Sequence, residues 1–191
     1  MSEQGSPRIV IAAYDDRWPA AYRELEALLR GALGDLAVRI DHIGSTSVPG
    51  LAAKDVIDIQ VSVARLDDPG LAPAFERLGA VATGIAADHV PPGQHGDPAD
   101  WAKRYFRPPS GWRPTHLHVR QVGRANQRYA LLFRDYLRQA PDAAAAYATI
   151  KRALARRHPD DVEAYYDVKD PVCDLVMDAA ERWAEQVGWS P

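Results

Sequence analysis

The fold is decided by residues 41–61, which read DHIGSTSVPGLAAKDVIDIQV. An apolar run over residues 38–43 leads into a polar Gly-Ser-Thr-Ser turn and a Pro-Gly bend, and a second apolar run follows at residues 56–63. Short runs of alternating apolar and polar residues are typical of β-strands, and Gly, Ser and Pro mark the turns between them. The stretch therefore predicts two strands joined by a polar turn and a short irregular crossing.

The second predicted strand carries a carboxylate, Asp58. Successive side chains of a strand point to opposite faces, so Asp58 and Gln60 share one face and Ile57 and Ile59 share the other. A carboxylate within an otherwise apolar strand is costly to bury unless it is paired or binds a cation. Asp58 is thus a candidate metal ligand. Gln60 offers only a neutral oxygen, so we expect one metal ion rather than the two-metal site that paired carboxylates would build.

Two histidines, His116 and His118, stand two positions apart in a later predicted strand. Such residues project from the same side of the strand, about 7 Å apart. If this strand lies beside that of Asp58, two imidazoles and one carboxylate converge. Such a set suits Zn²⁺, Mn²⁺, Fe²⁺ or Ni²⁺ better than Mg²⁺, because imidazole is the softer ligand. The alternatives are a general base, a phosphate-facing donor, or a purely structural pair.

The polar turn is a candidate phosphate-binding element. Gly44 permits a backbone turn with exposed amides, and its three neighbours supply hydroxyl groups: Ser45, Thr46 and Ser47. Lys54 follows within ten residues and has the charge to neutralise a phosphate. Arg120 shares the predicted face of His116 and His118, which makes it the favoured arginine for a triphosphate. The alternative for the turn is an ordinary Ser/Thr-rich bend, and for Lys54 a strand-edge position.

Composition narrows the function classes. With 191 residues, the chain fits a single domain, residues 1–191. The single cysteine, Cys173, excludes a disulfide framework. The sequence shows no signal peptide and no apolar run long enough for a membrane span. These features together predict a cytoplasmic location and no membrane partner. The phosphate-binding motif Gly-x-x-x-x-Gly-Lys-Ser/Thr is absent. Residues 101–158 contain 13 Lys and Arg against two Asp, which either attracts polyanions such as RNA or pairs with the acidic flanks.

The pattern along the chain predicts an α+β fold with its helices grouped late. A sheet-containing core is expected over about residues 10–122 and C-terminal helices over about 125–187. The expected helices are residues 18–34, 71–78, a helix from 126, 143–156 and 172–183, with breaks at Pro141, Pro159 and Pro171. The expected strands are 38–43, 56–63, one within 80–85, and a hairpin of 104–107 with 116–122. Residues 86–100 are rich in turn residues and predict a mobile loop.

Several motifs together resemble the GrpB family (UPF0157), which belongs to the nucleotidyltransferase-like superfamily. They are Tyr14-Asp15-x-x-Trp18-Pro19, residues 42–54 with Ile57-Asp58-Ile59, His116-Leu117-His118-Val119, residues 133–138, the pair Tyr147 and Lys151, and Tyr166-x-x-Lys169. The resemblance covers about residues 14–184. It implies a mixed β-sheet with flanking helices, and a Gly-Ser turn that contacts the β- and γ-phosphates of a nucleotide. One departure is Asp55, where the family pattern usually has proline.

Three functional hypotheses follow. The first is a metal-dependent nucleotidyltransferase that binds a nucleoside triphosphate and transfers its nucleotidyl group to an unknown acceptor. In it Asp58 and His118 are catalytic, Asp58, His116 and His118 hold the metal (Mg²⁺ or Mn²⁺, or Zn²⁺ if both histidines ligate), and the turn, Lys54 and Arg120 bind phosphates. The second is a non-catalytic nucleotide- or metabolite-binding domain that has lost part of its acidic site. The third, which is not favoured, is an RNA-binding accessory protein.

Overall fold

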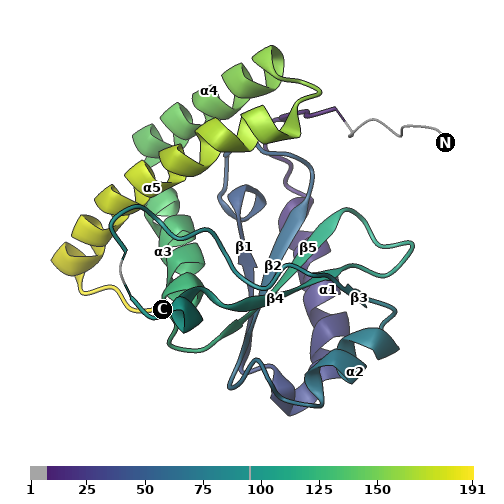
Figure 1. Ribbon diagram of the computed structural model, residues 1–191. Coiled ribbons are helices and arrows are strands. Elements are labelled where there is room, and N and C mark those ends of the chain that lie inside the picture. Colours follow the sequence, from purple (N-terminus) through teal and green to yellow (C-terminus); the bar gives the residue numbers. More distant parts are fainter. Residues whose placement is uncertain (1–7, 95) are drawn as a thin grey trace.

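A computed structural model describes residues 8–94 and 96–191. Its sheet has five strands in the order β1-β2-β5-β4-β3 (Figure 1). The strands are β1 (Arg39–Ile43), β2 (Ile57–Val63), β3 (Val81–Ala82), β4 (Lys103–Arg107) and β5 (Thr115–Gln121). The central pair, β2 and β5, is parallel, and the other neighbours are antiparallel. The fold is therefore α+β with a mixed sheet, as the sequence predicts.

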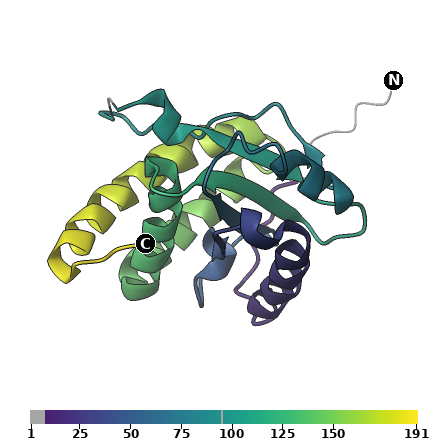
Figure 2. The same ribbon diagram turned by 90° about the horizontal axis from the view of Figure 1, so that it is seen from below.

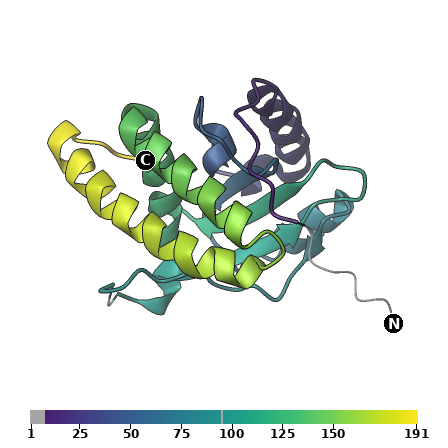
Figure 3. The same cartoon turned by 90° about the horizontal axis from the view of Figure 1, so that it is seen from above.

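The helices lie on both faces of the sheet (Figures 1 and 2). They are α1 (Trp18–Leu33), α2 (Leu71–Arg77), α3 (Ala125–Gln139), α4 (Pro141–Arg157) and α5 (Val162–Val187), with short 3-10 turns η1 (Gly34–Leu36), η2 (Ser45–Ser47) and η3 (Pro98–Trp101). Helices α1 and α2 share one buried apolar cluster with the sheet. Helix α3 covers the opposite face, and α4 and α5 pack against it and against each other (Figure 3).

Successive side chains of β2 and β5 point alternately to these two helical layers. Ile57 and Ile59 of β2 and Leu117 of β5 are fully buried in the cluster beneath α1 and α2. Burial of this apolar row fixes the strand register, because a slip of one residue would turn every side chain to the wrong face. The intervening polar side chains, including Asp58 and His116, are consequently directed to the face that α3 and α5 cover.

Two predicted elements differ from the structure. The strand expected within residues 80–85 is only the two-residue β3. The break expected at Pro171 is wrong, since α5 runs through it from Val162 to Val187. A proline inside a helix costs about 3 kcal/mol. Here Tyr165, Cys173 and Met177, on both sides of the proline, are all buried against α3 or α4, and this burial keeps one continuous helix. No helix within the described residues combines the length and apolar character needed to cross a membrane.

Candidate metal centre and adjoining cavity

Asp58, His116 and His118 converge on the face of the sheet that the C-terminal helices cover. The parallel register of β2 and β5 places Asp58 opposite His116 and Gln60 opposite His118. Asp58 Oδ1 lies 2.8 Å from His116 Nδ1 and 3.9 Å from His118 Nε2, and the three ligand atoms all lie within 4.8 Å of one another. Ligands around one ion with bonds of ~2.1 Å stand roughly 3.0–3.4 Å apart. Small rotations of these side chains therefore fit them to one divalent metal ion.

The electrostatics of the cluster favour the ionisation states that bind a metal. Burial opposes the charge on Asp58, but the hydrogen bond from His116 and the nearby imidazole of His118 outweigh it and hold the pKa of the carboxyl well below its usual range. Burial lowers the pKa of His118 to about 4, although Asp58 opposes the shift. At neutral pH the cluster thus has an ionised carboxylate and a neutral imidazole, the forms that coordinate metals. The ring of Tyr105 flanks both histidines.

The predicted phosphate-binding turn lies directly beside this cluster. Gly44 has a φ of 69° and accepts a 2.6 Å hydrogen bond from the Ser47 hydroxyl. The hydroxyl of Thr46 donates to Val56 O at 3.1 Å and accepts from His42 Nε2 at 2.9 Å. Thr46 and Ser47 are buried, and their hydroxyls hold the turn together. Ser45 is only partly buried and lines the adjoining cavity, so it is the hydroxyl of the turn that is available to a ligand.

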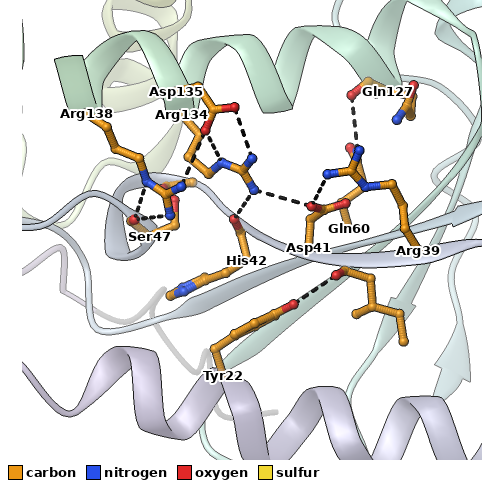
Figure 4. A network of polar contacts seen from close by, with 12 residues as sticks. Tyr22, Arg39, Asp41, His42, Ser47, Gln60, Gln127, Arg134, Asp135 and Arg138 are labelled. Atoms are coloured by element: carbon orange, nitrogen blue, oxygen red, sulfur yellow. Dashed lines mark hydrogen bonds and ion pairs between the residues drawn. The ribbon is translucent and has the colours of Figure 1, made fainter. Parts of the chain in front are cut away.

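Helix α3 holds the turn from above (Figure 4). Arg138 donates two hydrogen bonds to Ser47 O, at 2.8 and 3.1 Å, and Arg134 donates to His42 O at 3.1 Å. Arg134 also pairs with Asp135 and Asp41. Because side chains alternate along β1, the ring of His42 is directed to the other face of the sheet. There it stacks on Tyr22, with ring centres 4.8 Å apart. These contacts fix the backbone of the turn relative to the sheet.

A cavity of about 300 Å³ opens between the turn, the metal cluster and the C-terminal helices. Three lysines line it. Lys54 Nζ donates to Tyr166 Oη at 2.7 Å, Lys169 pairs with Asp170 at 2.9 Å, and Lys151 donates to Ala52 O at 2.7 Å. Its apolar wall comes from Tyr129, Phe133, Tyr147, Tyr165 and Cys173. An aromatic cavity lined by three lysines has the character of a site for an anionic ligand with a planar part.

The sequence alone assigns no role to Lys151 or Lys169. Both stand in the family motifs, and nothing in a helical sequence says which of its lysines face a cavity. Tyr129, Phe133 and Tyr147 pack in the apolar clusters of the C-terminal helices, and they also line the cavity.

Arg120 and Gln60 belong to a buried polar network beside the cluster. The Arg120 guanidinium donates to Asp88 at 2.8 and 3.0 Å and to Gln60 Oε1 at 2.6 Å, and Gln60 Nε2 donates to Gln127 O at 3.1 Å. Gln60 of β2 thus contacts β5 through the oxygen of its amide and α3 through the nitrogen. Arg120 lines the cavity, as expected of a phosphate ligand, but its phosphate role stays a prediction.

Asp88 anchors the loop that the sequence predicts to be mobile. Its carboxylate accepts from Arg120, from Lys103 at 2.7 Å and from Asn126 at 3.0 Å. The loop thereby closes one side of a second cavity of about 330 Å³, which Trp101 and His89 also line. His118, Arg120 and Lys169 line both cavities, so the two spaces adjoin at the metal cluster.

Just over half of the 13 Lys and Arg in the basic segment, residues 101–158, form ion pairs within the fold. Seven of its side chains form ion pairs with aspartate or glutamate: Lys103, Arg113, Arg120, Arg124, Arg128, Arg134 and Arg138. Six of the partners lie outside the segment, in the acidic flanks: Asp41, Asp55, Asp88, Asp97, Asp100 and Glu181. This arrangement is the one expected if the charge asymmetry serves the fold, and it gives no support to an extended RNA-binding surface.

Comparisons with known proteins identify relatives of this chain. The profile of a family described as GrpB protein matches residues 8–179. A dephospho-CoA kinase of Mycolicibacterium paratuberculosis is 38% identical over 93% of this chain and 47% of its own length. The UPF0157 protein SCO7215 of Streptomyces coelicolor is 38% identical over 70% of this chain and 63% of its own.

A solved structure agrees with the fold described above. The crystal structure of conserved protein GrpB from Enterococcus faecalis has a TM-score of 0.71 to this chain at 31% identity, and the match covers 91% of this chain and 99% of that one. Among the curated relatives, this chain spans about half the length of the dephospho-CoA kinase it matches.

Proposed function

This chain belongs to the GrpB family, and from that premise we propose that it is a metal-dependent nucleotidyltransferase-like enzyme, which binds a nucleoside triphosphate and transfers its nucleotidyl group to an acceptor. The observation that carries the proposal is the convergence of Asp58, His116 and His118 at the edge of a cavity lined by three lysines. A carboxylate with two imidazoles suits Mn²⁺ or Zn²⁺ better than Mg²⁺. A bound ion of this kind would neutralise the phosphates and polarise the reacting phosphorus centre.

The residues of the chain supply binding and positioning. Gly44 offers the backbone amides of the turn to the terminal phosphates, and Lys54 and Lys169 balance their charge. The aromatic wall suits the base or sugar of the nucleotide. His118, neutral at pH 7, serves as a ligand or as the base that accepts a proton from the attacking hydroxyl. The second cavity, which shares His118 with the first, is where we place the acceptor. We also retain the predicted cytoplasmic location as part of this proposal.

The kinase named among the relatives is not carried over to this chain. The chain spans 47% of the mycobacterial protein and lacks the Gly-x-x-x-x-Gly-Lys-Ser/Thr motif with which many kinases bind phosphates.

The second candidate is a non-catalytic nucleotide-binding domain. The observation that favours it is Gln60, whose amide joins Arg120 to Gln127 and adds no charge beside Asp58. Both candidates predict metal-dependent nucleotide binding. They differ in turnover, because only the enzyme releases pyrophosphate.

Thermal unfolding with each of the four common nucleoside triphosphates, with and without Mg²⁺, Mn²⁺ or Zn²⁺, tests the proposal. A ligand at 100 times its Kd stabilises the folded state by about 2.7 kcal/mol. We expect this gain for the wild type with Mn²⁺ or Zn²⁺ and its loss in Asp58→Asn, which keeps the shape of the side chain. Asp67→Asn, at an exposed site paired with Arg65, is the matched control. Equal stabilisation of Asp58→Asn and wild type would overturn the metal site, and stabilisation without pyrophosphate release favours the binding domain.

A further inference from the structure

Lys151 reaches across the cavity from α4 to the turn that follows β1. Its ammonium nitrogen lies 2.8 Å from Ser45 Oγ and 2.7 Å from Ala52 O, and 4.5 Å from the centre of the Tyr147 ring. The side chain is 2% exposed. Its described partners are thus two neutral oxygens and one ring face, with no carboxylate among them. A buried lysine without a counter-ion is costly as a cation, and is usually tuned for a chemical role.

The surroundings of Lys151 favour its neutral form. Burial lowers its pKa to about 7, and the nearby charge of Lys169 acts in the same direction, whereas Cys173 and Asp58 oppose it. Arg152 on its own helix also lowers the pKa. A neutral amine keeps one N–H for Ala52 O and offers its lone pair to the hydroxyl of Ser45. The same pairing of a serine with a neutral lysine activates the nucleophile in Ser-Lys hydrolases.

Ser45 is placed as a nucleophile would be. It is the first residue of η2, directly after Gly44, whose backbone contacts the Asp58 carboxylate. It lines the same cavity as Asp58 and His118. The other two hydroxyls of the turn donate to backbone oxygens, and Arg138 of α3 donates to Ser47 O. The serine is therefore fixed at the end of a strand, with its base supplied by a separate helix.

We propose that Ser45 is a nucleophile and Lys151 its general base. The electrophile, which rests on the proposed function, is the α-phosphorus of the nucleotide. Ser45 Oγ forms a bond to this phosphorus, the bond from phosphorus to the bridging oxygen breaks, and pyrophosphate leaves. The hydroxyl proton passes to Lys151 Nζ. The resulting nucleotidyl-serine then transfers its group to the acceptor, whose own proton is released, and Ser45 recovers its proton from Lys151.

Labelling with a fluorophosphonate tests the nucleophile without metal or nucleotide. Ser45 Oγ would form a bond to phosphorus and displace fluoride, and peptide mass spectrometry would locate the adduct. We expect labelling of Ser45 in the wild type and in Ser110→Ala, which alters an exposed serine, and none at this site in Ser45→Ala. Lys151→Met, of similar length but without a base, should react roughly 100-fold more slowly, the usual contribution of general base catalysis. An unlabelled Ser45 in the wild type, or an unchanged rate in a folded Lys151→Met, overturns the proposal.

The pH profile of the wild type tests the role of Lys151 as a general base even if Lys151→Met does not fold. The labelling rate should rise as pH increases through about 7, where Lys151 loses its proton. A rate that is flat between pH 6 and 8 overturns the role of Lys151.

Incubation with ATP and Mn²⁺ separates this inference from the proposed function. A gain in mass of one nucleotidyl group on Ser45 supports both. Fluorophosphonate labelling without a nucleotidyl adduct supports the nucleophile but overturns the nucleotide as its substrate. Metal-dependent nucleotide binding with no labelling of Ser45 overturns the nucleophile and leaves the proposed function standing.

Discussion

Gly44 packs so closely on Asp58 that position 44 has no room for a side chain. A Cβ built on Gly44 would lie 2.9 Å from both Cβ and Cγ of Asp58, a separation that real Cβ atoms essentially never show. Glycine is therefore needed at position 44 for two reasons. Its φ of 69° disfavours other residues, and the contact with Asp58 leaves no space for a Cβ atom. The turn therefore lies in direct contact with Asp58, the carboxylate of the candidate metal site.

Substitution of Gly44 by alanine should disrupt the metal centre. The added methyl group must displace the Asp58 carboxylate from His116 and His118, and the backbone conformation at position 44, with a φ of 69° and a ψ of −175°, adds about 1–3 kcal/mol of strain. Gly50→Ala is the matched control, because Gly50 has a φ of 77° but no atom within 4 Å of a built Cβ. We expect both variants to lose stability in urea unfolding, and only Gly44→Ala to lose Mn²⁺ binding by calorimetry. Equal metal affinity in the two variants would contradict the coupling of the turn to Asp58.

Conversion of Gln60 to glutamate should not rebuild a two-carboxylate site. The amide of Gln60 is directed to Arg120 and Gln127, so a carboxylate there would pair with the Arg120 guanidinium instead of reaching the metal cluster. We expect the Mn²⁺ Kd of Gln60→Glu to stay within about tenfold, or 1.4 kcal/mol, of wild type. A much tighter Kd, measured by calorimetry, would mean that the side chain turns toward Asp58 and that the acidic pair is recoverable.

The convergence of Asp58, His116 and His118 was predictable from residue spacing. Side chains alternate with a period of two along strands, so Asp58 had to face away from the apolar row of Ile57 and Ile59. His116 and His118 likewise had to share one face. Only the pairing of the two strands was conditional, and the parallel register of β2 and β5 confirms it.

The contribution of the C-terminal helices could not be predicted in the same way. Whether Lys151 reaches the cavity depends on how α4 packs across α5, and helical periodicity says nothing about that angle. Asp88 was missed because a loop rich in turn residues has no period that identifies a buried position. The break at Pro171 was wrong because burial along all of α5 outweighs the local cost of proline, which a sequence-based rule cannot weigh.

Removal of the Asp88 carboxylate should be strongly destabilising. Asp88→Ala leaves the buried guanidinium of Arg120 and the ammonium group of Lys103 without their counter-ion, and breaking a buried ion pair costs about 3–5 kcal/mol. Asp88→Asn keeps the shape and some of the hydrogen bonds and should cost less. In urea unfolding, Asp67→Ala, at an exposed pair, should remain near wild type. A loss for Asp88→Ala no greater than that of Asp67→Ala would mean that the loop is not anchored by this residue.

Protonation of His42 should contribute to unfolding in mild acid. Burial lowers the pKa of His42 to about 4, whereas an unfolded histidine has a pKa of about 6.5. Between these values the unfolded state binds the proton and the folded state does not, so stability is complete above pH 6.5 and falls as pH decreases toward 4, by at most about 3 kcal/mol. His42→Gln can still donate to Thr46 Oγ1 but cannot take up the proton. The acid-sensitive groups His118 and Asp58 are present in both proteins, so their effects cancel in the difference. Urea unfolding of both proteins is measured from pH 7.5 to 4. The difference in the free energy of unfolding between wild type and variant should narrow or reverse as pH falls. A difference that is independent of pH would show that His42 is not responsible for this acid sensitivity.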